Sequence, residues 1–242
     1  MELAASAAAP AWIGFAGGIV AAIVSAFVAF RVARLNGELQ TEIQERKALL
    51  EREERAEEVL KRYREPLAAA AFDLQSRLYN ILCLDFFAMF GGDHERCAIA
   101  ESTTLFRLAQ YLGWSEILRR DIQFLSFPEA DDTRRVVELQ WAITRRLSSS
   151  LDHHGLMVWA DEQRAIGELM IVEEHGKVLC MGYARFHDEY AERFAPWCER
   201  LRGELQSEIA RDRLRDVQRL LCDLVETLDA QRVRYTQDLE RS

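Results

Sequence analysis

Paired arginines are the residues of this sequence that most clearly suggest a binding function. A guanidinium group binds carboxylates and phosphates through parallel hydrogen bonds, so arginines gathered on helices could hold an anionic ligand. Seven residues in the middle of the chain form this candidate patch: Arg119, Arg120, Arg134, Arg135, Arg145, Arg146 and Arg164. We favour the ordinary alternative, a solvated surface in which these arginines pair with nearby acidic residues such as Asp131, Asp132 and Glu138.

The residues from 152 to 192 contain the densest group of titratable side chains. Asp152, His153 and His154 are adjacent, and His175 and His187 follow. Neighbouring histidines on one backbone point in different directions, so we expect a polar loop and no metal site.

The sequence contains no phosphate-binding loop, no G-x-S-x-G, no H-E-x-x-H and no protein-kinase signature. We therefore predict no catalytic residue, no cofactor, and a protein that is not an enzyme. A membrane-tethered enzyme that uses residues 152–192 is one alternative.

The cysteines support neither a disulfide framework nor a zinc site. There are five, an odd number, and no two have C-x-x-C spacing: Cys83, Cys97, Cys180, Cys198 and Cys222. We expect them to be reduced, in a cytosolic environment.

The N-terminal region has the composition of a membrane anchor. No charged residue occurs in the 28 residues from Leu3 to Phe30. After a short extracytoplasmic tail (1–10), we predict one transmembrane helix at 11–30, in contact with lipid, because about 20 apolar helical residues cross a bilayer. Arg31 and Arg34 follow it and only Glu2 precedes it, so the positive-inside rule places the N-terminus outside the inner (cytoplasmic) membrane and the rest in the cytoplasm. A cleaved signal peptide, the alternative, would need a basic residue before the apolar run.

Small residues recur along this predicted span. Five of them are candidates for helix packing or for lining a pore: Gly14, Gly18, Ala22, Ser25 and Ala26. In lipid, small residues allow helix backbones to approach closely, so the pattern favours a homo-oligomer over a lone anchor.

The rest of the chain is predicted to be helical. Residues 31–65 hold nine acidic and nine basic residues and form a charged stalk with a weak coiled-coil seam. The cytosolic body (66–242) should begin with a helix at Pro66 and contain helices at about 67–90, 101–112, 115–126, 130–149, 161–172 and 196–240. Around 155–186, short apolar stretches flanked by glycine predict a minor β-hairpin or irregular loops, so the fold class is mainly α.

Charge excludes one class of partner for the whole body. Subtracting Glu2 and the neutral stalk from the total of −9 leaves −8 on residues 66–242, so the body is not a general nucleic-acid binder.

Three segments resemble a family of uncharacterised bacterial single-span membrane proteins: YREPLAAAAFDLQSRLYNI (63–81), DEQRAIGELM (161–170) and CMGYARF (180–186). That resemblance implies no activity. In layout, without a shared motif, the chain also resembles the membrane channel effector of Hailong-type anti-phage defence, which a partner nucleotidyltransferase controls through its oligonucleotide product. The layout implies an anionic ligand such as an oligonucleotide and a cytosolic protein partner.

Three functions are therefore open. The first is a homo-oligomeric effector with a ligand-controlled ion channel, in anti-phage defence. The second is a membrane-tethered helical scaffold for a cytosolic protein, and the third is the tethered enzyme.

Overall fold

The computed structural model describes residues 9–90, 92–122, 131–151, 155–229, 234–235 and 239–242. The chain divides into two compact units between Glu51 and Arg52, inside the segment that we predicted as a stalk. It is mainly helical, as predicted.

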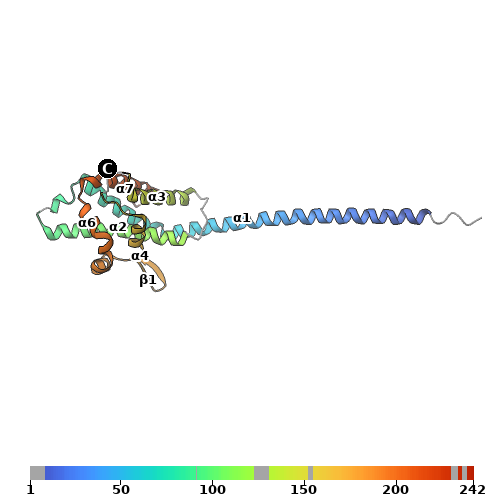
Figure 1. Cartoon of the computed structure of the whole chain (residues 1–242), viewed down its shortest axis with the longest axis horizontal. Helices are drawn as coiled ribbons and strands as arrows, with labels where there is room; N and C mark the ends of the chain where they lie inside the picture. Colours follow the sequence, from blue (N-terminus) through green and yellow to red (C-terminus); the bar gives the residue numbers. More distant parts are fainter. Residues whose placement is uncertain (1–8, 91, 123–130, 152–154, 230–233, 236–238) are drawn as a thin grey trace, which may run out of the picture. The chain divides into compact units, whose positions relative to one another are not determined.

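The first helix, α1 (Ala9–Cys83), is 75 residues long and contributes to both units (Figure 1). The predicted membrane span at 11–30 is helical as part of it, but most side chains of that span lie outside the described ones. Within the described part of the chain, none of the helices combines the length and the apolar character that a membrane crossing requires.

The prediction that a new helix begins at Pro66 is wrong, because Pro66 lies inside α1. Proline removes one backbone hydrogen bond from a helix interior and usually kinks or ends it. Here the turns on both sides are held by packing, since Tyr63 and Leu67 are buried. Most of the apolar period predicted after Pro66 is confirmed by buried side chains: Leu67, Ala71, Leu74, Leu78, Ile81 and Leu82. The helix predicted at 67–90 ends earlier, at Cys83, and Phe86 of the same period is only partly buried.

The two helices predicted at 101–112 and 115–126 form one helix, α2 (His94–Ile122), which continues through Gly113. Residues 123–126 of that prediction lie outside the described residues. A Cβ at Gly113 would lie 2.8 Å from Cys180 Sγ and 2.8 Å from Met170 Cβ. This glycine therefore permits close packing and does not end the helix.

The same principle explains how α2 packs against α4 (Ala160–Leu169). A Cβ at Gly167 would lie 2.7 Å from the carbonyl oxygen of Leu112 and 2.9 Å from Glu116 Cβ. The two helix backbones thus approach more closely than any larger residue would allow.

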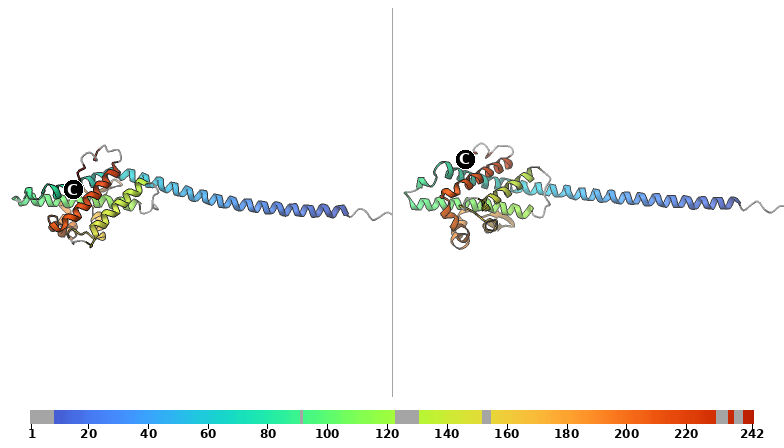
Figure 2. Two further views of the ribbon diagram at one scale, coloured as in Figure 1. Left: turned by 90° about the horizontal axis from the view of Figure 1, so that it is seen from above. Right: turned by 45° about the horizontal axis from the view of Figure 1, so that its top comes forward.

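The predicted helix at 130–149 corresponds to α3 (Asp131–Ser148), which lies beside α7 (Arg211–Leu228) (Figures 1 and 2). The prediction of one helix at 196–240 is wrong: α6 (Ala195–Glu204), η3 (Glu208–Ala210) and α7 replace it. Leu205 and Ala210 are both buried but five residues apart. In one straight helix, residues with this spacing would lie on different faces, so both could not face the same core. The chain breaks between them, which leaves Ile209 exposed.

The minor hairpin predicted near 155–186 is confirmed. Strands β1 (Ile171–Glu174) and β2 (Lys177–Cys180) pair antiparallel, with Glu174 opposite Lys177. The two linking residues, His175 and Gly176, have φ of 52° and 72°, as a tight hairpin turn requires. The chain then continues through α5 (Tyr183–Glu189) and the π-helical segment η2 (Tyr190–Phe194) into α6, and η1 (Ala88–Phe90) joins α1 to α2.

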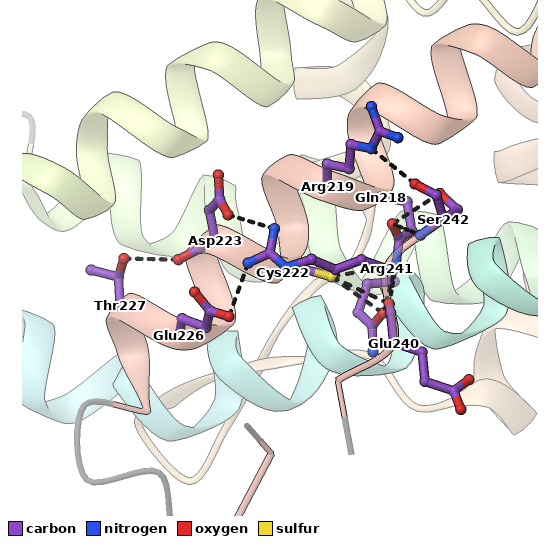
Figure 3. Close-up of polar contacts among 10 residues, drawn as sticks. Gln218, Arg219, Cys222, Asp223, Glu226, Thr227, Glu240, Arg241 and Ser242 are labelled. Atoms are coloured by element: carbon purple, nitrogen blue, oxygen red, sulfur yellow. Dashed lines mark hydrogen bonds and ion pairs between the residues drawn. The ribbon is translucent and has the colours of Figure 1, made fainter. Parts of the chain in front are cut away.

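Residues 239–242 lie against α7 (Figure 3). The guanidinium group of Arg241 bridges the carboxylates of Asp223 and Glu226, each at 2.9 Å. Ser242 donates its backbone N–H to the side-chain oxygen of Gln218 at 3.3 Å. We call residues 239–242 the C-terminal strap.

Candidate functional site

The first arginine pair of the predicted patch serves the structure of the body. Arg119 and Arg120, at the end of α2, contact the same Glu116 oxygen at 2.6 and 2.8 Å, and Arg120 also pairs with Glu168 of α4 at 3.1 Å. Glu116 is only 3% exposed. Burial alone would raise the pKa of Glu116, but the hydrogen bonds from the two arginines bring it below its usual value.

Two other members of the patch have acidic neighbours on their own helices. Arg135 lies 3.6 Å from Glu138 on α3, and Arg164 lies 3.9 Å from Asp161 on α4. These ion pairs fit the solvated surface that we favoured from the sequence, since exposed pairs of this kind contribute little. Arg134 is exposed on the same helix as Arg135.

The remaining pair, Arg145 and Arg146, lies in a groove between α3 and α7. The main part of this groove has a volume of about 780 Å³, and a second part of about 710 Å³ adjoins it. We call both parts together the α3–α7 groove. Its polar, charged and aromatic lining residues are Trp141, Arg145, Arg146, Ser148, Ser149, Ser150, Asp212, Arg213, Arg215, Asp216 and Arg219.

The groove is positively charged although the body is acidic. Five arginines and two aspartates line it, which leaves a net charge of +3. Three of these arginines, Arg213, Arg215 and Arg219, lie on α7 and were not part of the predicted patch. The available signal was the spacing of Arg215 and Arg219, four residues apart on one helix face, but only the packing of α7 on α3 adds them to Arg145 and Arg146.

Arg213 explains why a positive groove forms at the C-terminal end of α3. Its side chain is 2% exposed and donates hydrogen bonds to the carbonyl oxygens of Arg146, Leu147 and Ser149, at 2.6, 3.1 and 2.9 Å. The last carbonyls of a helix carry partial negative charge and need donors. Because Arg213 supplies both donors and charge, this helix end does not repel an anion as strongly as a bare one would.

The other four arginines of the groove differ in their partners. Arg146 pairs with Asp216, and Arg215 pairs with Asp212, both at 2.8 Å. Arg145 and Arg219 have no aspartate or glutamate partner among the described residues.

These two arginines have other contacts. The guanidinium carbon of Arg145 lies 4.8 Å from the ring centroid of Trp141. The Nε of Arg219 donates to the carbonyl oxygen of Ser242 at 2.9 Å (Figure 3). The groove thus presents guanidinium groups, serine hydroxyls and an indole ring that is 63% exposed, which is chemistry for binding an anion.

The histidine region shows no such arrangement in the part that the structure describes. Asp152, His153 and His154 lie outside the described residues. His187 is exposed, with its Nδ1 3.8 Å from Asp188, and His175 lies in the hairpin turn. Among described residues, no three His, Cys, Asp or Glu side chains are grouped closely enough to hold a metal ion.

Three of the cysteine thiols are poor nucleophiles. Burial raises the pKa of Cys180 and of Cys198 to about 12, and that of Cys222 to about 11. All three therefore stay protonated at neutral pH, and the thiolate is the reactive form.

The predicted pore or packing residues of the N-terminal segment lie mostly outside the described side chains. These are Gly14, Gly18, Ala22 and Ala26, whereas the side chain of Ser25 is described and is exposed.

Comparisons with known proteins gave no match: no protein-family model, no curated protein and no solved structure is similar to this chain.

Proposed function

We propose that this protein is a homo-oligomeric membrane effector in which the helical body binds an anionic ligand and thereby controls an ion-conducting pore formed by the N-terminal segments. The membrane segment in this proposal comes from the sequence, namely the uncharged run from Leu3 to Phe30 followed by Arg31 and Arg34. Its place would be the inner membrane, with the N-terminus outside and the body in the cytoplasm.

The observation that carries the proposal is a row of apolar residues on α1 that stays half exposed within the described part of the chain. Val32, Leu39, Ile43 and Leu50 are each about half exposed, at 49, 53, 50 and 53%. They are separated by seven, four and seven residues, which is heptad spacing. A second copy of the same helix would cover them, so the row supports self-association close to the proposed span.

The row is incomplete, which is consistent with a modest contact. Arg46 and Asn36 occupy positions where the same heptad would place apolar residues. Small residues at Gly14 and Gly18 would add a close helix contact within lipid, and the two contacts together would hold the oligomer.

The body supplies the ligand-binding part of the proposal. Its α3–α7 groove is positively charged within an acidic unit, and α7 packs on the part of α1 that lies in the body core, through the Gln218–Gln75 hydrogen bond of 3.1 Å. Because α1 also contains residues 11–30, a ligand that alters α7 would act on the helix that contains the proposed span.

Planar-bilayer recording of the purified full-length chain tests the pore directly. We expect discrete conductance steps, and we expect Ser25→Leu to reduce the conductance while crosslinked oligomers persist. Ser25→Ala is the matched control, because it keeps a small side chain and should conduct nearly as well as the wild type.

Two results would contradict the proposal. A C-terminal reporter found outside the cytoplasm would refute the topology. Oligomers that insert in bilayers and never conduct, with or without anionic ligands, would instead favour the membrane-tethered scaffold.

A further inference from the structure

The α3–α7 groove combines two recognition elements that a general anion site does not need. One is the pair of exposed guanidinium groups of Arg145 and Arg219, which lack aspartate and glutamate partners among the described residues; Arg219 contacts the backbone oxygen of Ser242. The other is the exposed indole of Trp141, which lies on the wall of the main part of the groove and has the Arg145 guanidinium over one face of its ring. Guanidinium groups suit phosphate oxygens, and an exposed indole suits a flat ring.

From this combination we infer that the groove binds a nucleotide-like ligand, a phosphate ester with a planar ring, whose phosphates lie against Arg145 and Arg219 and whose ring stacks on Trp141. This inference rests on the proposed function, because it names the class and the location of the controlling anion. The volume of about 780 Å³ suits one such molecule, since pockets for small ligands have about 300–1,000 Å³.

The remaining charges of the groove favour a ligand with more than one negative charge. Asp216 and Asp212 neutralise Arg146 and Arg215, and Arg213 is committed to backbone carbonyls. Arg145 and Arg219 are therefore the charges left for the ligand. Arg219 already binds an oxygen, the Ser242 carbonyl at 2.9 Å, so a phosphate there would extend or replace an existing contact with the C-terminal strap.

Ser148, the last residue of α3, and Ser149 and Ser150, which follow it, lie on the same wall, and the Ser148 hydroxyl already donates to the carbonyl oxygen of Thr144 at 3.0 Å. Their neighbouring carbonyls are occupied by Arg213. The groove thus offers donors to a phosphate at a helix end whose acceptors are already satisfied.

Isothermal titration calorimetry on the full-length chain in mild detergent tests the inference with two probes, ATP and inorganic pyrophosphate. Arg145→Gln and Arg219→Gln should each weaken binding of both probes by about tenfold or more, as expected for loss of a charge-assisted hydrogen bond. Trp141→Ala should weaken ATP binding by about fivefold or more and leave pyrophosphate binding unchanged, because only ATP has a ring to stack.

The chain provides matched controls for both kinds of substitution. Arg96 is an exposed arginine on α2 and Trp159 an exposed tryptophan, 55% accessible, and neither lines the groove. Arg96→Gln and Trp159→Ala should leave both affinities unchanged. Since the groove residues to be changed are also exposed, their variants should keep the wild-type thermal unfolding temperature.

Three results would overturn the inference: no binding of ATP at millimolar concentration, equal effects of groove and control variants, or an unchanged ATP affinity in Trp141→Ala. Vesicles with and without anionic lipid form a further arm. Arginine-dependent binding to anionic vesicles that ATP does not displace would assign the groove to lipid headgroups and refute the nucleotide. These outcomes are independent of conductance, so failure of the pore would leave the binding result standing.

Discussion

The side-chain amide of Gln218 on α7 donates a hydrogen bond to Oε1 of Gln75 on α1 over 3.1 Å, and the two side chains are 0 and 1% exposed. Gln218 also donates to the carbonyl oxygen of Glu240 at 2.6 Å and accepts from Ser242 (Figure 3). One buried glutamine therefore joins three segments: α7, α1 and the C-terminal strap. A buried polar network of this kind fixes a single packing arrangement, because any shift leaves its members without partners.

Removing both glutamines of this pair should cost less than the sum of the costs of removing each one alone. Gln218→Met leaves the buried Gln75 oxygen without its amide donor, so we expect the free energy of unfolding to fall by about 1–3 kcal/mol. The double variant Gln75→Met/Gln218→Met should lose less than the sum of the single losses. Chemical denaturation measures all three, and Gln206→Met, an exposed control, should change stability by less than about 0.5 kcal/mol. Strict additivity would show that the pair does not couple.

Arg213 should matter for stability far more than its neighbour on the same helix. Arg213→Met removes the donor to the carbonyl oxygens of Arg146, Ser149 and Gly155 and leaves that of Leu147 with only the Val158 N–H, so we expect a loss of about 2–4 kcal/mol. Arg215→Met removes only the ion pair with Asp212, a carboxylate that is 83% exposed, and should cost less than about 1 kcal/mol. Thermal unfolding followed by circular dichroism compares the two, and similar losses would refute the capping role.

Gly167 tests the close approach of α2 and α4. In Gly167→Ala the new Cβ would lie 2.7 Å from the Leu112 carbonyl oxygen, a backbone atom that has little freedom to move, so we expect a loss of about 1–3 kcal/mol. Gly203 on α6 is the matched control, because a Cβ there meets nothing within 4 Å. Gly203→Ala should stabilise the chain by about 0.5 kcal/mol through helix propensity.

Local sequence patterns correctly predicted the helices in which apolar residues recur at regular helical spacing. The apolar spacing of Leu67, Ala71 and Leu74 predicted a core face on α1, and the periodicity of 130–149 predicted α3. The patterns failed where contacts with distant parts of the chain determine whether a helix ends or continues. Gly113 resembled a helix end because its contact with Cys180 comes from a distant hairpin, and the change of phase between Leu205 and Ala210 was hidden within an otherwise regular apolar row.

The candidate site was predictable only in part, for the same reason. Arg145 and Arg146 were recognisable as a pair on one helix. Arg219 joins them only through the packing of α7 on α3, and the sequence gives no measure of that distance. Conversely, Arg119 and Arg120 resembled a ligand site as strongly as any pair, but both contact the buried Glu116.

Glu116 should make the body sensitive to acid. Its pKa is lower in the folded protein than the usual value of 4.5, because Arg119 and Arg120 offset the effect of burial. The folded state therefore gains stability above about pH 4.5 and loses it as the pH falls through the lowered pKa. Glu116→Gln should cost about 1 kcal/mol at pH 7, a modest value because both arginines are partly exposed, and should flatten the fall in stability between about pH 5 and pH 3. Urea unfolding across this range measures it, and parallel pH profiles for variant and wild type would contradict the assignment.

The C-terminal strap should control access to Cys222. This thiol is fully buried on α7, lies 3.7 Å from the Glu240 carbonyl oxygen of the strap, and has a pKa raised to about 11 by burial. Deleting residues 239–242 removes that cover, so a thiol reagent should label Cys222 at least about tenfold faster at neutral pH, because labelling then no longer waits for local opening. The measurement needs Cys83→Ser, Cys97→Ser and Cys180→Ser in the background, since Cys83 is exposed and Cys97 and Cys180 are partly exposed. Cys198 is equally buried but lies on α6, where no strap residue bonds to its thiol, and serves as the internal control: its labelling rate should not change.

Equal acceleration at both thiols would mean that the deletion loosens the whole body, and an unchanged rate at Cys222 would show that α7 and α1 alone bury it.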